Sequence, residues 1–165
     1  MDLERTIEEA EKGNLITMRY LGALFRDGDE VLRDYLESAK WYRKAADLGD
    51  CAAQIEMAKI YLLEWGFAKD EVEAVKWFRK AADQGDAMAQ CDLGSCYELG
   101  TGVAVDLVEA YGYFSLAGII LDFSRTKRDK LEIGMPYSSV LRGQQRAKEL
   151  QKEIEDKMAA KKSRN

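Results

Sequence analysis

The sequence predicts an all-α protein built from repeated pairs of helices, and three observations lead to that fold class. Segments of similar sequence recur every 36 residues without gaps. The chain of 165 residues contains one proline, which favours long uninterrupted helices over a loop-rich β protein. Apolar residues within each segment follow the three-to-four spacing of an amphipathic helix. A repeat of this length is typical of a solenoid, in which each unit packs on its neighbours.

The second helix of each unit carries the clearest copy of the repeat. Residues 37–50 read ESAKWYRKAADLGD, and residues 73–86 read EAVKWFRKAADQGD. A weaker third copy, EAYGYFSLAG, occupies residues 109–118. One bulky ring beside two small alanines suits helices that cross closely, so we expect Trp41 and Trp77 to lie in the core between repeats.

A different signature marks the first helix of each unit. It reads LGALF at residues 21–25, MAKIY at residues 57–61 and LGSCY at residues 93–97. The glycine or alanine at its second place lets a neighbouring helix approach closely. In the third unit, we expect the first helix over residues 87–99 and the second over about 106–117, with a glycine-containing loop between them.

Capping residues recur at the same period. Asp34, Asp70 and Asp106 stand where the second helix of each unit begins, and a glutamate follows each aspartate three residues later. This is the pattern of a capping box, in which the cap and the glutamate satisfy free backbone amides reciprocally. Glycines after each second helix suit left-handed C-terminal caps, and the next residue caps the following helix. These pairs are Gly13-Asn14, Gly49-Asp50 and Gly85-Asp86.

These signals divide the chain into a repeat region over residues 1–122 and a C-terminal segment over residues 123–165. The repeat region is expected to contain a capping helix at 2–12 and repeats at about 14–49, 50–85 and 86–121. The C-terminal segment is expected to form a long helix from about Tyr137 that caps the solenoid. As an alternative, the part of that helix beyond Leu150 projects and pairs with a second chain.

The pattern resembles that of the Sel-one-like repeat (SLR) family, a relative of the tetratricopeptide repeats. Residues 89–110, AQCDLGSCYELGTGVAVDLVEA, match the first half of the family pattern almost throughout, and residues 40–49 and 76–85 match its second half best. One departure is Glu64, which stands where a loop glycine is usual. The resemblance implies a right-handed α/α superhelix and a non-enzymatic module. It further implies that a protein or peptide binds on the concave surface lined by the first helices.

Positions of the first helices that the packing signature leaves free are candidate partner-binding residues. They differ in type from repeat to repeat, as we expect of a surface shaped for a ligand. They are Tyr20, Ala23 and Asp27; Glu56, Lys59 and Leu63; and Met88, Asp92, Ser95 and Leu99. Trp65 and Phe67, in the loop of the middle unit, either pack under a neighbouring loop or form exposed anchors for a partner.

Composition argues against most catalytic classes. Without histidine, the chain cannot form Ser-His-Asp or Cys-His nucleophilic sites or an HExxH zinc site. Cys91 and Cys96 are five residues apart, about 140° around a helix, so they do not converge on a metal. We expect no catalytic residue, metal or cofactor. A hydrolase of the kind claimed for cysteine-rich relatives of the SLR family is the weakest alternative.

Charge is unevenly distributed along the chain. Residues 1–122 carry 13 basic and 24 acidic side chains, a net charge of −11, whereas residues 123–165 carry 12 and 6, a net charge of +6. We therefore expect the C-terminal segment to dock partly on the last repeat, and the partner to be a protein or peptide of basic character rather than nucleic acid or membrane.

Within this class, three roles stay open: an adaptor, a bacterial inhibitor of a cognate effector, and a homo-oligomeric scaffold assembled through the C-terminal helix. An odd number of cysteines favours reduced thiols and a cytoplasmic location. A periplasmic or secreted location is the alternative if a signal peptide has been removed.

Overall fold

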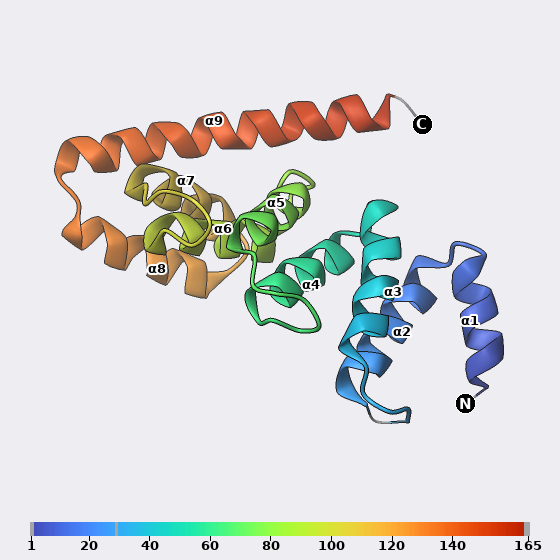
Figure 1. Cartoon of the computed structure of the whole chain (residues 1–165). Helices are drawn as coiled ribbons and strands as arrows, with labels where there is room; N and C mark the ends of the chain where they lie inside the picture. The colour runs from blue at the N-terminus through green and yellow to red at the C-terminus, as the bar shows by residue number, and fades with distance from the viewer. Residues whose placement is uncertain (1, 29, 164–165) are drawn as a thin grey trace. The chain divides into compact units, whose positions relative to one another are not determined.

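The computed structural model describes residues 2–28 and 30–163, and these ranges contain nine helices and no strand (Figure 1). The all-α prediction is confirmed. The helices are α1 (Leu3–Glu11), α2 (Leu15–Asp27), α3 (Tyr35–Asp47), α4 (Cys51–Leu62), α5 (Glu71–Ala82), α6 (Ala87–Leu99), α7 (Leu107–Ala117), α8 (Asp122–Gly134) and α9 (Tyr137–Lys162). The helix expected near the N-terminus is α1, and the two expected in the third unit are α6 and α7.

The chain divides by its internal contacts into two compact units, Met1–Trp77 and Phe78–Asn165, and the division falls within α5. From here on, the first unit and the second unit are these two compact parts of the chain, and one pair of helices of the 36-residue pattern is called a repeat. The second unit holds both the third repeat and the C-terminal segment, because α7 packs against α8 and against α9. The boundary at residue 122 therefore stays a prediction about where the repeats end. It does not coincide with the division between the two compact units, which lies between Trp77 and Phe78.

Close approach of consecutive helices depends on the small residue of the first-helix signature. In the first unit, a Cβ added to Gly22 of α2 would lie 2.9 Å from the ring of Tyr42 in α3. In the second unit, a Cβ added to Gly94 of α6 would lie 2.8 Å from the ring of Phe114 in α7. Both helix pairs repeat the same ring-on-glycine contact, so the signature encodes helix packing, as the sequence indicates.

The aspartate caps form as expected, but the reciprocal half of the capping box is wrong. Asp34 Oδ1 accepts hydrogen bonds from the N–H groups of Leu36 and Glu37, and Asp106 accepts the equivalent pair. The aspartate N–H groups do not need a glutamate, because each donates to a carbonyl of the preceding first helix. These bonds are Asp34 to Phe25, Asp70 to Tyr61 and Asp106 to Tyr97, at 2.8, 3.1 and 2.9 Å.

The glutamates of the box instead form ion pairs. Glu37 and Glu73 pair with Lys40 and Lys76 one turn later, at 3.0 and 2.9 Å. Glu109 pairs with Arg146 of α9 at 2.7 Å. The third repeat therefore uses the same position to hold the C-terminal helix.

Buried side chains of the second helices form the core, as the repeat predicts. Trp41 and Trp77 are each 2% exposed. In the second unit, Phe114 is fully buried and packs with Cys91, Ala110 and Ala117. Large rings and small alanines thus fill the space between successive helices.

The C-terminal helix α9 lies along α7 and caps the second unit (Figure 1). Two glycines make this contact close: Gly143 lies against the ring of Tyr111, and Gly112 lies against Leu150. Beyond Leu150, Ile154 is also buried, and Lys157 Nζ meets Asp83 Oδ1 at 2.8 Å. The alternative that this part of the helix projects from the repeats is wrong, because Ile154 is buried within the chain and Lys157 pairs with a residue of the second unit. Oligomerisation itself stays a prediction.

Glu64 has a left-handed backbone, with φ of 57°. Gly28 and Gly100 occupy the equivalent position of the other repeats, each 36 residues away, with φ of 75° and 74°. Each of the three residues follows a first helix, where the chain must reverse direction. The middle repeat therefore forms the same turn as its neighbours with a residue that carries a Cβ.

Replacing Glu64 by glycine is expected to raise the free energy of unfolding by about 0.5–1 kcal/mol, because glycine removes the steric cost of the left-handed conformation. The gain is partly offset, since glycine also increases the conformational entropy of the unfolded chain. Urea unfolding would measure the change. The matched control is Gly100→Ala, which should be destabilising because its Cβ would also lie 2.9 Å from Val105 Cγ2. A loss of stability in Glu64→Gly would contradict the proposed strain.

Candidate partner-binding faces

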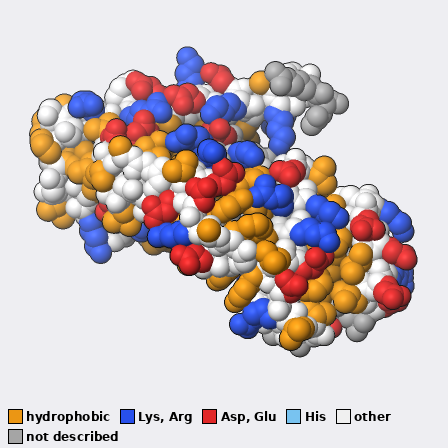
Figure 2. Space-filling model, in the orientation of Figure 1, with side chains coloured by type: hydrophobic (Ala, Val, Ile, Leu, Met, Phe, Trp, Pro, Cys, Tyr) orange, Lys and Arg blue, Asp and Glu red, His pale blue; other side chains and the backbone are white. Residues whose placement is uncertain are grey.

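In the first unit, the candidate residues lie on α2 and at α4 and differ in exposure. Tyr20 is 43% exposed and Leu63 is 52% exposed. Asp27 is also exposed, whereas Ala23, Glu56 and Lys59 are half-buried. Exposed apolar side chains stand among charges of both signs on the molecular surface (Figure 2). The face thus offers apolar contact area at Tyr20 and Leu63 with charged groups between.

Arg26 organises these charges and was missed by the sequence analysis. Its guanidinium Nη1 donates to Glu56 Oε2 at 2.8 Å and to Tyr42 Oη at 3.3 Å, while its Nε lies 2.7 Å from Asp27 Oδ1. Lys59 Nζ meets the other oxygen of Glu56 at 2.7 Å. Two of the candidate carboxylates are therefore already paired. The spacing of residues 26 and 56 does not follow the repeat, so no pattern along the chain signals this contact.

Burial and hydrogen bonding account for the titration of this network. The hydrogen bond from Arg26 lowers the pKa of Asp27 and raises that of Arg26 itself. Burial raises the pKa of Tyr42 to about 12. Asp27, Arg26 and Tyr42 thus keep their ordinary charge states near neutral pH, and the network is a fixed feature of the face.

In the second unit, α6 presents Met88 and Leu99, 44% and 72% exposed, with Asp92 and Ser95 half-buried between them. Ser95 is engaged by the C-terminal segment, because Lys127 Nζ of α8 donates to its Oγ at 2.8 Å. The side chain of Lys127 also lies 5.3 Å from the ring centre of Phe114. The apolar ends of this face are therefore more available to a partner than its centre.

The loop aromatics are partly packed. Trp65 stacks on Tyr35 of the preceding repeat, with ring centres 5.8 Å apart and an angle of 9° between planes. Phe67 lies at a tilt against Tyr61, at 5.7 Å, and stays 38% exposed. Trp65 thus follows the packed alternative, and Phe67 retains surface for contact.

The cysteines lie in environments that do not favour nucleophilic chemistry. None of the three forms a disulfide within the described part of the chain, and Cys91 and Cys96 are buried. Burial raises the pKa of the Cys91 thiol, which reduces its thiolate fraction. Over residues 2–28 and 30–163, no three histidine, cysteine, aspartate or glutamate side chains are grouped to hold a metal ion. No helix in the same residues has the length and apolar character needed to cross a membrane.

Neighbouring positions of the first helices show opposite behaviour. Leu21, Met57 and Leu93 occupy one repeat position, are all apolar and are fully buried. One residue earlier stand Tyr20, Glu56 and Asp92, an aromatic residue and two carboxylates, of which Tyr20 is exposed and the other two are half-buried. Packing constrains the first position in every repeat, whereas the second is free to vary.

Comparison with protein families matches the Sel1 repeat at residues 16–50, 51–86 and 87–118, which is more than half of the chain. These repeats begin within two residues of those predicted from the sequence. A search of curated proteins gave no match.

Two solved structures share the fold. A Sel1 repeat protein from Oxalobacter formigenes is 29% identical, with a TM-score of 0.71 over 78% of this chain and 98% of that protein. The c5321 protein of uropathogenic Escherichia coli, described as a protective antigen displaying an SLR fold, is 27% identical with a TM-score of 0.68 over 98% of this chain. The match spans only 43% of the c5321 protein. With three matching repeats and the same solenoid fold as these proteins, this chain belongs to the Sel1 repeat family.

Proposed function

We propose that this chain is a non-catalytic interaction module that binds a protein or peptide on the exposed faces of its first helices. Sel1 repeat proteins generally mediate protein–protein interactions. The observation that carries the proposal is the contrast between a position that is apolar and buried in every repeat and the adjacent position, which holds a tyrosine or a carboxylate and keeps contact with solvent. Packing alone would not require an aromatic residue, Tyr20, in one repeat and a carboxylate, Glu56 or Asp92, at the same position of the other two.

The exposed apolar residues supply the main contact area in this proposal. Leu63 ends the first-unit face, and Leu99 ends the second-unit face, at equivalent repeat positions. Burying a leucine of this exposure against a partner contributes about 1–2 kcal/mol. Charged groups then set orientation: a basic residue of the partner would replace Lys59 on Glu56, since the Lys59 side chain is 41% exposed.

An adaptor and an inhibitor of a cognate bacterial effector are both consistent with this surface, and they differ in the partner that each would retain. Affinity purification from the native host followed by mass spectrometry identifies that partner. The reduced thiols support a cytoplasmic site of action. A basic partner should lose affinity as the salt concentration rises, because its attraction to the acidic repeats is screened.

Leu63→Ser and Leu99→Ser are expected to weaken binding of the purified partner about tenfold each, measured by isothermal titration calorimetry. The matched controls are Leu48→Ser and Leu141→Ser, which remove leucines that are 61% and 46% exposed but lie outside the first-helix faces. Unchanged affinity in both test variants, or an equal loss in the controls, would count against these faces as the binding surface.

A further inference from the structure

A row of three adjacent hollows, here called the groove, lies along one flank of α9 in the second unit, away from the first-helix candidates. It consists of three hollows of about 320, 290 and 390 Å³. Leu116, Ile119 and Gln151 line both of the first two hollows, and Gln84 and Met158 line both of the last two. Because neighbouring hollows share lining residues, they lie next to one another between α9 and the turns that flank α6 and α7.

The wall formed by α9 has helical regularity. Ala147, Gln151, Ile154, Met158 and Lys162 line the groove and are spaced by three or four residues, so they lie on one face of the helix. The span from residue 147 to residue 162 corresponds to about 22 Å. A partner helix of about fifteen residues has the same length.

The opposite wall leaves apolar side chains in solvent. Ile119 and Ile120, in the turn between α7 and α8, are each 71% exposed, and Met158 across the groove is 39% exposed. No described residue of this chain covers them. Gln84, Gln151 and Glu155 also line the middle hollow, so its apolar side chains lie among polar ones. Exposed apolar side chains in a concave surface with a polar border suit the apolar face of an amphipathic helix, the geometry of helix-in-groove recognition.

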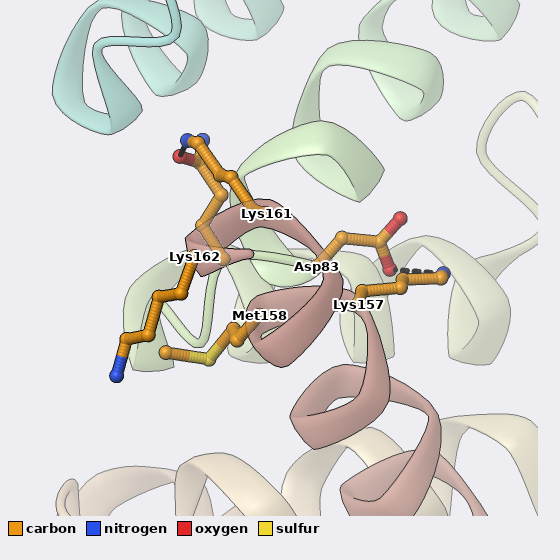
Figure 3. Close-up of a pocket in the computed structure, with 6 residues that line it drawn as sticks. Asp83, Lys157, Met158, Lys161 and Lys162 are labelled. Carbon is orange, nitrogen blue, oxygen red and sulfur yellow. Dashed lines mark hydrogen bonds and ion pairs between the residues drawn. The ribbon is translucent and has the colours of Figure 1, made fainter. Parts of the chain in front are cut away.

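Unpaired positive charge marks the two ends of the groove. Lys148 lines the first hollow and Lys162 lines the last, and neither forms an ion pair with a described residue. The neighbouring lysines are engaged, since Lys157 bonds to Asp83 and Lys161 bonds to Gln84. Figure 3 shows Met158 and Lys162 on one side of α9, with Lys157 and Asp83 meeting on the other.

We propose that this groove binds an amphipathic helix of a protein partner, with apolar residues on its buried face and acidic residues near both ends. The apolar face packs between Ile119 and Met158. The acidic residues pair with Lys148 and Lys162, which the chain itself leaves available. This surface is additional to the first-helix faces, and its charge is opposite to that of the acidic repeats, so the two surfaces select partners of different chemistry.

The test uses a labelled helical peptide of about fifteen residues, stapled in its helical form, with leucines on one face and glutamates near both ends. Fluorescence anisotropy measures its affinity for the full chain, and amide chemical shifts locate the contact. We expect shifts at Ile119, Gln151 and Met158. Ile119→Glu should weaken binding at least about tenfold, and so should the double variant Lys148→Glu with Lys162→Glu.

Matched controls keep the test independent of folding. Ile133→Glu changes an isoleucine of α8 that is 87% exposed and lies outside the groove. Lys130→Glu reverses the charge of an exposed residue in the same helix. Neither variant should alter the affinity for the peptide. A peptide with lysines in place of the glutamates should bind the double variant more tightly than the unmodified chain. Circular dichroism melting of each variant checks that the fold is retained.

Several results would overturn the proposal. They are an absence of saturable peptide binding, shifts confined to other surfaces, and an equal loss of affinity in Ile133→Glu. Two other occupants give different signals. A dimer detected by light scattering and abolished by Ile119→Glu would assign the groove to a second copy of the chain. Binding to anionic phosphatidylserine vesicles lost in the same variant would assign it to a membrane surface.

Discussion

Replacing Trp41 by alanine is expected to lower the free energy of unfolding by about 3–5 kcal/mol, the largest effect of any substitution considered for this chain. The indole is 2% exposed, and Lys44 Nζ lies 4.3 Å from its ring centre. Removing the ring leaves a cavity that the rigid helix pairs cannot close. Urea unfolding followed by circular dichroism is the appropriate measurement, because the substitution also removes a fluorophore.

Trp65→Ala is the matched control for this prediction. The same side chain is removed, but from a half-buried loop position where it stacks on Tyr35. Its loss should cost about 1 kcal/mol. If the two variants were equally stable, the view that Trp41 is a core residue of the repeat and Trp65 a loop contact would be wrong.

Gly143→Ala is expected to lower the free energy of unfolding by about 1–3 kcal/mol, and Gly143→Leu by more. A Cβ at this position would lie 2.7 Å from Tyr111 Cδ1, so α9 must move away from α7 to accept it. Thermal unfolding measures the loss, and amide exchange in α9 shows whether the helix detaches from the repeats.

Gly134→Ala provides the control for overpacking. Gly134 ends α8, and a Cβ added there has no heavy atom within 4 Å. Alanine should therefore be neutral or stabilising by up to about 1 kcal/mol through helix propensity. Combining Gly143→Ala with Tyr111→Ala should recover part of the loss, because the clashing ring is gone. A loss in Gly143→Ala unchanged by the second substitution would place the strain elsewhere.

The repeat explains why so much of the fold could be predicted. Helix periodicity, aspartate caps and the glycine of each first helix are local signals, and three copies at one period confirm one another. The N-terminal helix, the third-unit helices and the buried tryptophans followed from these signals alone. The sequence also showed Glu64 as a departure from the family pattern, whereas the left-handed conformation of its backbone, with φ of 57°, came only from the structure.

Long-range charge contacts were the part that sequence reasoning missed. The capping-box glutamates pair with lysines or with Arg146, because the aspartate N–H groups already bond to the preceding first helix. Arg26 reaches Glu56 across two helices, outside the 36-residue register. Such contacts depend on where long side chains meet after the helices have packed, and no single-segment pattern encodes that position.

The sequence by itself determined that this protein is an all-α solenoid of three repeats, because each repeat contains its own helices, caps and packing residues. It also determined the uneven charge, with an acidic repeat region and a basic C-terminal segment. Only the tertiary structure decided how those charges are used. It seats α9 on α7 through Gly112 and Gly143, pairs Arg146 with Glu109, and leaves Lys148 and Lys162 unpaired beside an apolar groove. The physical reason is that helix formation is local, whereas the surface left for a partner is what remains after distant segments have packed.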